Sequence, residues 1–185
     1  MADTERDKML RGDLYLGGDP ELVVGRNRAR RLWQQYNATD PEAKSQRTEL
    51  LTTLLGSLGT DVLVEPPFYC DYGTQITLED GVYINMNNVF LDCASIHIGA
   101  QTYLATNVQL LTATHPLNAA ERAAGPESAR PITIGSRCWL GGGVIVCPGV
   151  TIGEDTTIGA GSVVVKDIPA GVLAVGNPCR VVREV

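Results

Sequence analysis

From Ile134 onward, the chain divides into successive groups of six residues that share three constrained positions. The first position of each group is aliphatic, the second is glycine in four of the six groups, and the fifth is small or β-branched. A period of six fits neither an α-helix nor an alternating hairpin. It indicates short strands joined by turns, each directing one aliphatic side chain into a common core. The aliphatic first positions are Ile134, Leu140, Val146, Ile152, Ile158 and Val164.

The same pattern continues upstream of this block. Val82 and Ile98 are 16 residues apart, which is not a multiple of six, so the register slips once between them. Three strands close one triangular coil, and stacked coils share a ladder of aliphatic side chains. The pattern therefore predicts a parallel β-helix over residues 61–185, with repeat glycines placed either for a positive φ or for close packing. The upstream groups start at Ile76, Val82, Ile98, Leu104 and Leu110.

Residues 1–60 lack the repeat and are predicted to form a helical segment. Aspartate precedes proline at positions 19–20 and again at 40–41, which indicates an N-cap followed by proline in the first turn of a helix. Gly56 stands where a C-terminal cap is expected. The basic stretch over residues 26–31 is interpreted as a solvated or interface face.

A loop is predicted at residues 112–131, where the repeat is interrupted and later resumes in phase. Long excursions from a rigid scaffold often carry function. His115 stands at the start of this loop, and histidine is well suited to taking a proton from an alcohol near neutral pH. His115 is therefore a candidate general base, whereas His97, which lies within a repeat, is interpreted as structural.

Several polar side chains stand where stacked coils could bring them near His115. They are Asp71, Asn85, Asp92 and, near the far end of the loop, Glu127. We hypothesise that Glu127 orients the imidazole. An asparagine in such a site could donate a hydrogen bond to developing negative charge.

Composition narrows the function classes. The formal net charge of −6 argues against a nucleic-acid binder, and no apolar run is long enough to cross a bilayer. Five cysteines without a CxxC pair and only two histidines leave no zinc-ligand spacing, so no metal is expected. The polar start of the chain has no apolar signal-peptide region. We therefore expect a cytoplasmic protein with reduced thiols and without membrane or nucleic-acid partners.

Several longer motifs resemble the maltose and galactoside O-acetyltransferase family over residues 5–185. The most specific is ATHP, which contains His115, because hexapeptides also occur in many unrelated transferases. The resemblance implies a left-handed parallel β-helix and an enzyme that moves an acetyl group from acetyl-CoA to a hydroxyl of a small sugar. The other matching motifs are KMLRGDLY, VEPPFYCDYG, YINMN, PITIG, WLGGGVIVCPGVTIG, IGAGSVVVKDIP and GNPCRVVRE.

The same resemblance implies roles for individual residues. His115 would be the general base in a direct attack on the thioester, and Asn85 would stabilise the transition state. Asp71, Asn85 and Asp92 would contact the sugar, in a site between the subunits of a homotrimer. Two arginines would meet the phosphates or adenosine of CoA, which suits their guanidinium geometry. The residues expected to line acetyl-CoA are Trp139, Gly142, Gly159, Ala160, Lys166, Arg180 and Arg183.

Three positions distinguish the branches of that family. This chain has Gly17 and Cys93 where the galactoside branch carries acidic residues, and Gly142 where that branch has serine. It therefore resembles the maltose branch more closely, and acceptors of the maltose or glucose type are expected. The alternatives are a hexapeptide acetyltransferase for a non-sugar acceptor, such as an antibiotic or serine, and a noncatalytic β-helix scaffold. A β-helix lyase of the carbonic anhydrase type would need about three histidine zinc ligands, and the chain has two histidines in all.

Overall fold

Four helices occur in the computed structural model, which describes residues 3–185. They are α1 (Glu5–Arg11), α2 (Pro20–Asn37), α3 (Lys44–Leu54) and α4 (Ala119–Ala123). α1 begins with a capping box, in which Thr4 and Asp7 satisfy each other's backbone N–H groups. α2 begins as predicted, because the Asp19 carboxylate accepts the N–H of Glu21 and proline occupies the first turn.

Two details of the next helix differ from the prediction. Asp40 Oδ1 accepts the N–H of Glu42 at 2.8 Å, but the chain makes a turn there and α3 begins only at Lys44. Gly56 does not have the left-handed conformation of a helix cap. A Cβ at Gly56 would instead collide with the carbonyl group of Thr74. Glycine is therefore required at this position because the chain packs closely on the adjacent coil.

Three sheets form the walls of the coil, and each is named after one of its strands. The β10 face contains β4 (Phe68–Cys70), β7 (Asn88–Leu91), β10 (Gln109–Leu111), β15 (Ile145–Val146) and β18 (Val163–Val164). The β8 face contains β2 (Ser57–Leu58), β5 (Ile76–Leu78), β8 (Ile96–Ile98), β13 (Ile132–Ile134) and β16 (Thr151–Ile152). The β14 face contains β3 (Leu63–Val64), β6 (Tyr83–Ile84), β9 (Tyr103–Leu104), β14 (Trp139–Leu140), β17 (Thr157–Ile158), β19 (Val172–Val175) and the antiparallel β20 (Arg180–Glu184).

Aliphatic ladders fill the inside of the coil, and from Ile98 onward they lie at the positions that the repeat predicted. In the first groups the prediction was two residues early, because Leu78 and Ile84, and not Ile76 and Val82, are the register partners of Ile98 and Leu104. On the β8 face, Leu78, Ile98, Ile134 and Ile152 are in register on successive strands. Each of these side chains is at most 1% exposed. Burial of one such side chain contributes roughly 1.5–3 kcal/mol, so the ladders are a major source of the stability of the coil.

The repeat glycines serve close packing between coils. A Cβ at Gly135 would lie 2.5 Å from the backbone nitrogen of Glu154 in the next coil. The left-handed conformation occurs two residues later in the turns, for example at Gly143 and Gly161. Of the two reasons predicted for the repeat glycines, close packing is therefore the one that applies.

Coils in the N-terminal half are longer than those further along the chain. Register partners are 20 residues apart between β7 and β10, and 18 residues apart between β15 and β18. The additional residues lie at the corner that follows the β10 face, in the turns 71–75 and 92–95. The register slip in the sequence thus corresponds to a widened corner of the coil.

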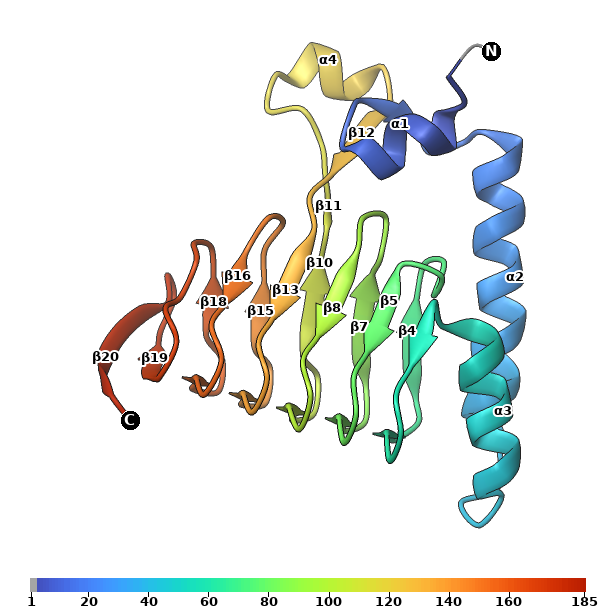
Figure 1. Cartoon of the computed structure of the whole chain (residues 1–185). Helices are drawn as coiled ribbons and strands as arrows, with labels where there is room; N and C mark the ends of the chain where they lie inside the picture. Colours follow the sequence, from blue (N-terminus) through green and yellow to red (C-terminus); the bar gives the residue numbers. More distant parts are fainter. Residues whose placement is uncertain (1–2) are drawn as a thin grey trace.

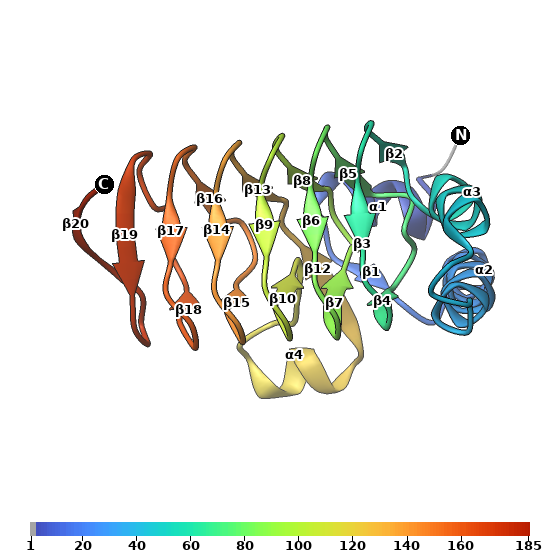
Figure 2. The same cartoon turned by 90° about the horizontal axis from the view of Figure 1, so that it is seen from below.

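The helices and the loop lie at defined places on this coil. Figure 1 shows α2 and α3 against its N-terminal end and β20 at its C-terminal end. The loop with α4 projects from the coil, and α1 lies beside the base of the loop. In the view turned by 90°, α4 stands outside the stack of coils (Figure 2). At the base of the loop, a small antiparallel sheet joins β1 (Tyr15–Leu16), β12 (Pro126–Ala129) and β11 (Ala113–Thr114).

This architecture is the predicted left-handed parallel β-helix with an N-terminal helical segment and a protruding loop. The first strand of the coil begins at Ser57, slightly before the expected start at residue 61. Within residues 3–185, no helix combines the length and apolar character needed to cross a membrane.

Candidate active site

Asp92 shapes the widened corner of the coil. Its side chain is fully buried, and its carboxylate accepts the N–H groups of Asp71 at 3.0 Å, Tyr72 at 2.8 Å and Gln75 at 3.3 Å. Three backbone donors of the long turn are thereby satisfied without water. Because Asp92 is 0% exposed, it holds the turn that carries Asp71. It does not present the surface that a direct sugar contact would need, which differs from the expectation.

Two other carboxylates reach this corner from different parts of the chain. Asp71 follows β4, and its Oδ2 accepts the thiol of Cys93 at 3.6 Å. Glu127 comes from β12, and its Oε2 accepts the hydroxyl of Tyr15 at 2.9 Å. Burial raises the pKa of Cys93 to about 12 and also raises the pKa of Tyr15. Both groups therefore stay protonated at neutral pH and anchor the two carboxylates as donors.

Gly17 leaves room for the side chain of Glu127. A Cβ at Gly17 would lie 2.6 Å from Glu127 Oε1, so a larger residue there would compete with the carboxylate for space. Cys93 lies beside Asp71 in a similar way. Gly17 and Cys93 stand where the galactoside branch has acidic residues. Each of them lies next to a carboxylate from another part of the chain, Glu127 and Asp71 respectively.

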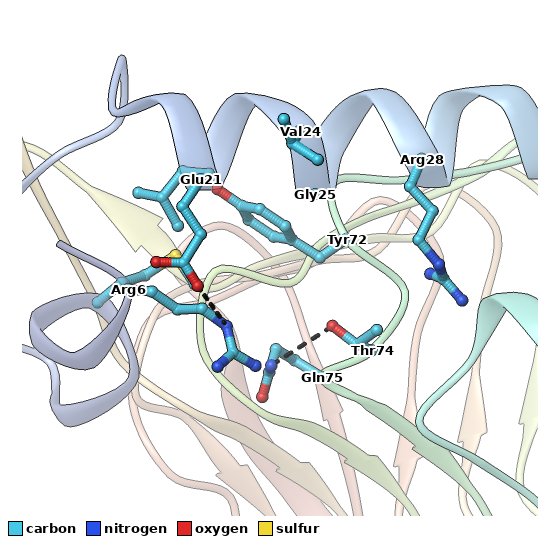
Figure 3. A pocket seen from close by; sticks show the side chains of 10 residues that line it. Arg6, Glu21, Val24, Gly25, Arg28, Tyr72, Thr74 and Gln75 are labelled. Carbon is cyan, nitrogen blue, oxygen red and sulfur yellow. Dashed lines mark hydrogen bonds and ion pairs between the residues drawn. The ribbon is translucent and has the colours of Figure 1, made fainter. Parts of the chain in front are cut away.

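Arg26 brings a cation to the same corner. Its Nη1 donates to the Tyr72 hydroxyl at 2.7 Å, and its Nη2 donates to the Gly17 carbonyl. Figure 3 shows the ring of Tyr72 next to α2 at Gly25, where a Cβ would lie 3.1 Å from the ring. Glycine lets α2 approach the ring closely, and the arginine next to it in the sequence therefore reaches both partners.

The charges at this corner influence one another. Burial raises the pKa of Asp71, the hydrogen bond from Cys93 and the charge of Arg26 lower it, and the charge of Glu127 raises it. Two carboxylates and a guanidinium are thus within electrostatic reach of each other. Together they offer hydrogen-bond acceptors and donors for a polyhydroxylated molecule.

His115 leaves the coil directly after β11, and its imidazole is exposed. Its Nδ1 lies 3.3 Å from the carbonyl oxygen of Pro126. A carbonyl oxygen can only accept, so this contact favours the tautomer with the proton on Nδ1, which leaves Nε2 available to take a proton. The group that orients the imidazole is therefore this carbonyl and not Glu127, whose side chain points across the sheet to Tyr15. A hollow of about 450 Å³ lies beside the imidazole.

The remaining predicted residues divide between two corners of the coil. Asn85 and Gly142 lie at the corner before the β10 face, whereas Asp71 and Lys166 follow strands of that face. His115 belongs to the second corner, because it follows β10 and β11. A stretch of about five extended residues separates the corners, which corresponds to roughly 17 Å. One chain therefore does not bring Asn85 and His115 to the same point.

The residues expected to line acetyl-CoA lie mainly towards the C-terminal end of the coil. Trp139 is 55% exposed on β14, in register with Tyr103 and Thr157. A Cβ at Gly142 would meet only Thr106, at 3.5 Å, which is an ordinary van der Waals distance, so packing within the chain does not require glycine there. The other members are Gly159 and Ala160 in the turn after β17, Arg180 and Arg183 on β20, and Lys166 after β18.

The protonation of Asp92 should make the stability of the protein depend on pH. Burial raises the pKa of Asp92 to about 7, whereas an unfolded aspartate titrates near pH 3.9. Between about pH 4 and pH 7 the folded state keeps a proton that the unfolded state has lost, so stability falls as the pH rises. We therefore expect Asp92→Asn to lose less thermal stability between pH 5 and pH 8 than the wild type does.

The matched control for this measurement is Asp80→Asn. Asp80 is exposed and accepts the N–H of Thr60 at 2.7 Å, and this hydrogen bond lowers the pKa of its carboxyl. Its removal should leave the difference between pH 5 and pH 8 unchanged. Parallel Tm curves for the wild type and Asp92→Asn would contradict the assignment.

Four groups of this site were not predicted from the sequence. They are Tyr15, Arg26, Tyr72 and the carbonyl of Pro126. Arg26 was included in a basic stretch that was interpreted as a solvated or interface face. Residues within one turn of a helix point in different directions, so the arginines of this stretch need not share one environment. For these four groups the sequence gives only an indirect signal, the slip of the repeat, which marks the place where the coil widens.

Comparison with known proteins agrees with the fold of the chain. The maltose acetyltransferase hexapeptide capping motif matches residues 8–59, and the bacterial transferase hexapeptide model of six repeats matches residues 131–166. The structure superposes on a maltose O-acetyltransferase from Clostridium difficile with a TM-score of 0.98 and 44% identity, over 100% of this chain and 99% of that one.

Two further structures show which ligands such folds bind. A galactoside acetyltransferase in complex with coenzyme A has a TM-score of 0.94 and 35% identity, over 99% of this chain and 92% of that one. An acetyltransferase from Vibrio cholerae, in complex with acetyl-CoA, has a TM-score of 0.91 and 37% identity, over 98% of both chains. With matches of this extent and identity, the chain belongs to the maltose and galactoside O-acetyltransferase family of hexapeptide-repeat acetyltransferases.

Proposed function

We propose that the chain transfers the acetyl group of acetyl-CoA to a hydroxyl of a small sugar of the glucose or maltose type. The observation that carries this proposal is the widened corner, where Asp71, Glu127 and Arg26 gather beside the loop with His115. Carboxylates and guanidinium groups are suited to hydrogen bonds with several hydroxyls at once. The five cysteines are unpaired, which fits the cytoplasm as the place of the reaction.

In the proposed reaction, His115 Nε2 removes the proton of the acceptor hydroxyl while the hydroxyl oxygen attacks the thioester carbonyl. The electron pair of the carbonyl bond moves to its oxygen, and the Asn85 side-chain NH₂ donates to this oxyanion. Collapse then breaks the C–S bond, and the imidazolium returns its proton to the CoA sulfur. The products are an acetate ester and free CoA, without an acyl-enzyme.

A neighbouring subunit would have to supply Asn85 to this reaction. Its Oδ1 accepts the N–H of Met86 at 2.8 Å, which leaves the NH₂ group as the donor for the oxyanion. Because Asn85 and His115 lie at different corners of one chain, their cooperation would need two subunits, and we propose a homotrimer with each site between two of them. Light scattering coupled to size exclusion should then give about three times the 19.8 kDa mass of the chain.

The surface around Trp139 suits the pantetheine arm and phosphates of CoA. The exposed indole offers a flat apolar contact, and the absence of a side chain at Gly142 lets a ligand approach the backbone closely. Arg180 and Arg183 can bind phosphate groups with their guanidinium donors. Acetyl-CoA is therefore proposed as the co-substrate, with its thioester directed towards the widened corner.

Glucosyl acceptors should be used better than galactosyl acceptors. The carboxylates of the corner that are free to meet an acceptor are Asp71 and Glu127, whereas positions 17 and 93 carry none. A galactoside that needs carboxylates at positions 17 and 93 would therefore have hydroxyls left without hydrogen-bond partners. We expect a preference of about tenfold in kcat/KM, equivalent to about 1.4 kcal/mol. The measurement is the release of CoA thiol with matched glucosides and galactosides at subsaturating concentration.

The same panel should contain serine and a hydroxyl-bearing antibiotic. A galactoside preferred by tenfold or more would contradict the acceptor assignment while leaving the acetyl transfer in place. Faster use of serine or the antibiotic than of every sugar would replace the sugar by a non-sugar acceptor. No release of CoA with any acceptor would favour a noncatalytic scaffold.

A further inference from the structure

The N-terminal segment supplies one strand to the small sheet at the base of the loop. β1 pairs with β12 in the register Tyr15–Glu127 and Leu16–Pro126, and β12 pairs on its other side with β11. Without β1, the loop base would be a two-stranded ribbon, and an isolated ribbon of this kind is only marginally stable in water. The strand that leads into His115 is thus held in a three-stranded sheet by residues 15–16.

Pro126 connects this sheet to the imidazole. Its carbonyl oxygen lies 3.3 Å from His115 Nδ1, and it faces Leu16 across the strands. Proline has no N–H, and the N–H of Leu16 is donated to a glutamate of α1 at 2.6 Å, so these two residues exchange no backbone hydrogen bonds. Pairs alternate along an antiparallel ladder, so the adjacent pair Tyr15–Glu127 carries the backbone hydrogen bonds. The attachment of β12 to β1 is therefore concentrated at Tyr15.

The side chain of Tyr15 strengthens this attachment. It is 1% exposed, and its hydroxyl donates to Glu127 Oε2 at 2.9 Å. α1 contacts the other end of the same strand, since a Cβ at Gly12 would lie 3.0 Å from the carbonyl oxygen of Ala129. The N-terminal segment thus fixes β12 at two points, and the point nearer to Pro126 is Tyr15.

We propose that Tyr15 is a positioning residue for the base, holding β12 so that the Pro126 carbonyl fixes the Nδ1–H tautomer of His115. The inference rests on the proposed function, in which Nε2 of this imidazole takes the acceptor proton. If the carbonyl moves away, the ring can rotate and exchange tautomers, and only one tautomer keeps Nε2 free as a base. Displacement of a reacting group by about 1 Å can lower a rate by about 10²-fold.

The test is NMR spectroscopy of the imidazole nitrogens. The chain has two histidines, so two sets of signals are expected, and His97→Asn assigns them. In the wild type, the neutral His115 ring should show a protonated Nδ1 and an unprotonated Nε2. In Tyr15→Phe, both nitrogens should move towards the averaged shifts of exchanging tautomers. If Tyr15→Phe does not fold, Glu127→Leu removes the same hydrogen bond from the other strand and must give the same averaged signals.

Tyr36→Phe is the matched control. Tyr36 is also 1% exposed, and its hydroxyl donates to the carbonyl of Val64, away from the loop. Its loss should leave the His115 signals and the rate unchanged, whereas Tyr15→Phe should lower kcat by about tenfold with the KM for acetyl-CoA unchanged. His115 signals in Tyr15→Phe that coincide with the wild-type signals would overturn the positioning role. A further outcome is that the wild type acetylates no sugar while its His115 signals still change in Tyr15→Phe. That result would refute the proposed function and retain the positioning role.

Discussion

Replacement of His115 by alanine should lower kcat with a sugar acceptor by roughly 10²–10⁴-fold, because the acceptor hydroxyl loses its general base. The KM for acetyl-CoA should change little, since the residues proposed to bind it lie on other strands. Steady-state kinetics with both substrates varied would separate the two effects. The 3.3 Å contact between His115 Nδ1 and the Pro126 carbonyl oxygen is the structural reason for expecting Nε2 to be the reacting nitrogen.

His97→Ala is the control for this prediction. His97 is the other histidine of the chain, and its Nε2 lies 3.1 Å from Glu79 Oε1 on the β8 face. Its replacement should leave kcat close to the wild-type value. Retention of more than half of the wild-type rate by His115→Ala would exclude the imidazole as the base.

Asn85→Ala and His115→Ala, each impaired alone, should recover activity when both kinds of chain are mixed in one trimer. Asn85→Ala should lower kcat by about 10²–10³-fold, because the oxyanion loses a donor, and His115→Ala should be impaired for the reason given above. If the site combines His115 of one subunit with Asn85 of the next, random mixing in equal amounts gives intact sites at about a quarter of the positions. Refolding or coexpression of the two variants should therefore restore about a quarter of the wild-type activity.

A chain that carries both substitutions is the control for the mixing experiment. Mixed with either single variant, it offers no complete pair of His115 and Asn85, and activity should stay at the level of the single variants. If the two single variants do not complement each other while native mass spectrometry still shows mixed oligomers, the site lies within one chain. That result would contradict the shared site without touching the role of His115.

Most of the fold could be predicted from the sequence because the hexapeptide period records a physical requirement on each coil. Ile134 and Ile152 must be aliphatic because they lie in one buried ladder. The start of α2 was also predictable, because its cap uses side chains adjacent in sequence. The start of α3 was not predictable. Asp40 makes the same local hydrogen bond as Asp19, but the turn that it closes does not continue into a helix.

The widened corner was predicted only in part, because its contacts join residues that are far apart in the chain. The bond between Tyr15 and Glu127 spans 112 residues and depends on the pairing of β1 with β12. Neither residue carries a local pattern that reveals this pairing. Asp92 illustrates the reverse case, since its position near the site was predicted but its burial made it a support for the turn. Burial and strand partners are long-range properties that one repeat does not encode.

The most direct test of the central claim is identification of the product. Acetyl-CoA and maltose incubated with the wild type should give one O-acetylated sugar for each CoA released, seen by mass spectrometry and by the NMR signals of the acetate ester. His115→Ala under the same conditions should give neither product above the uncatalysed background. Release of CoA without an acetylated sugar, or equal formation of the ester by His115→Ala, would contradict the proposed transfer.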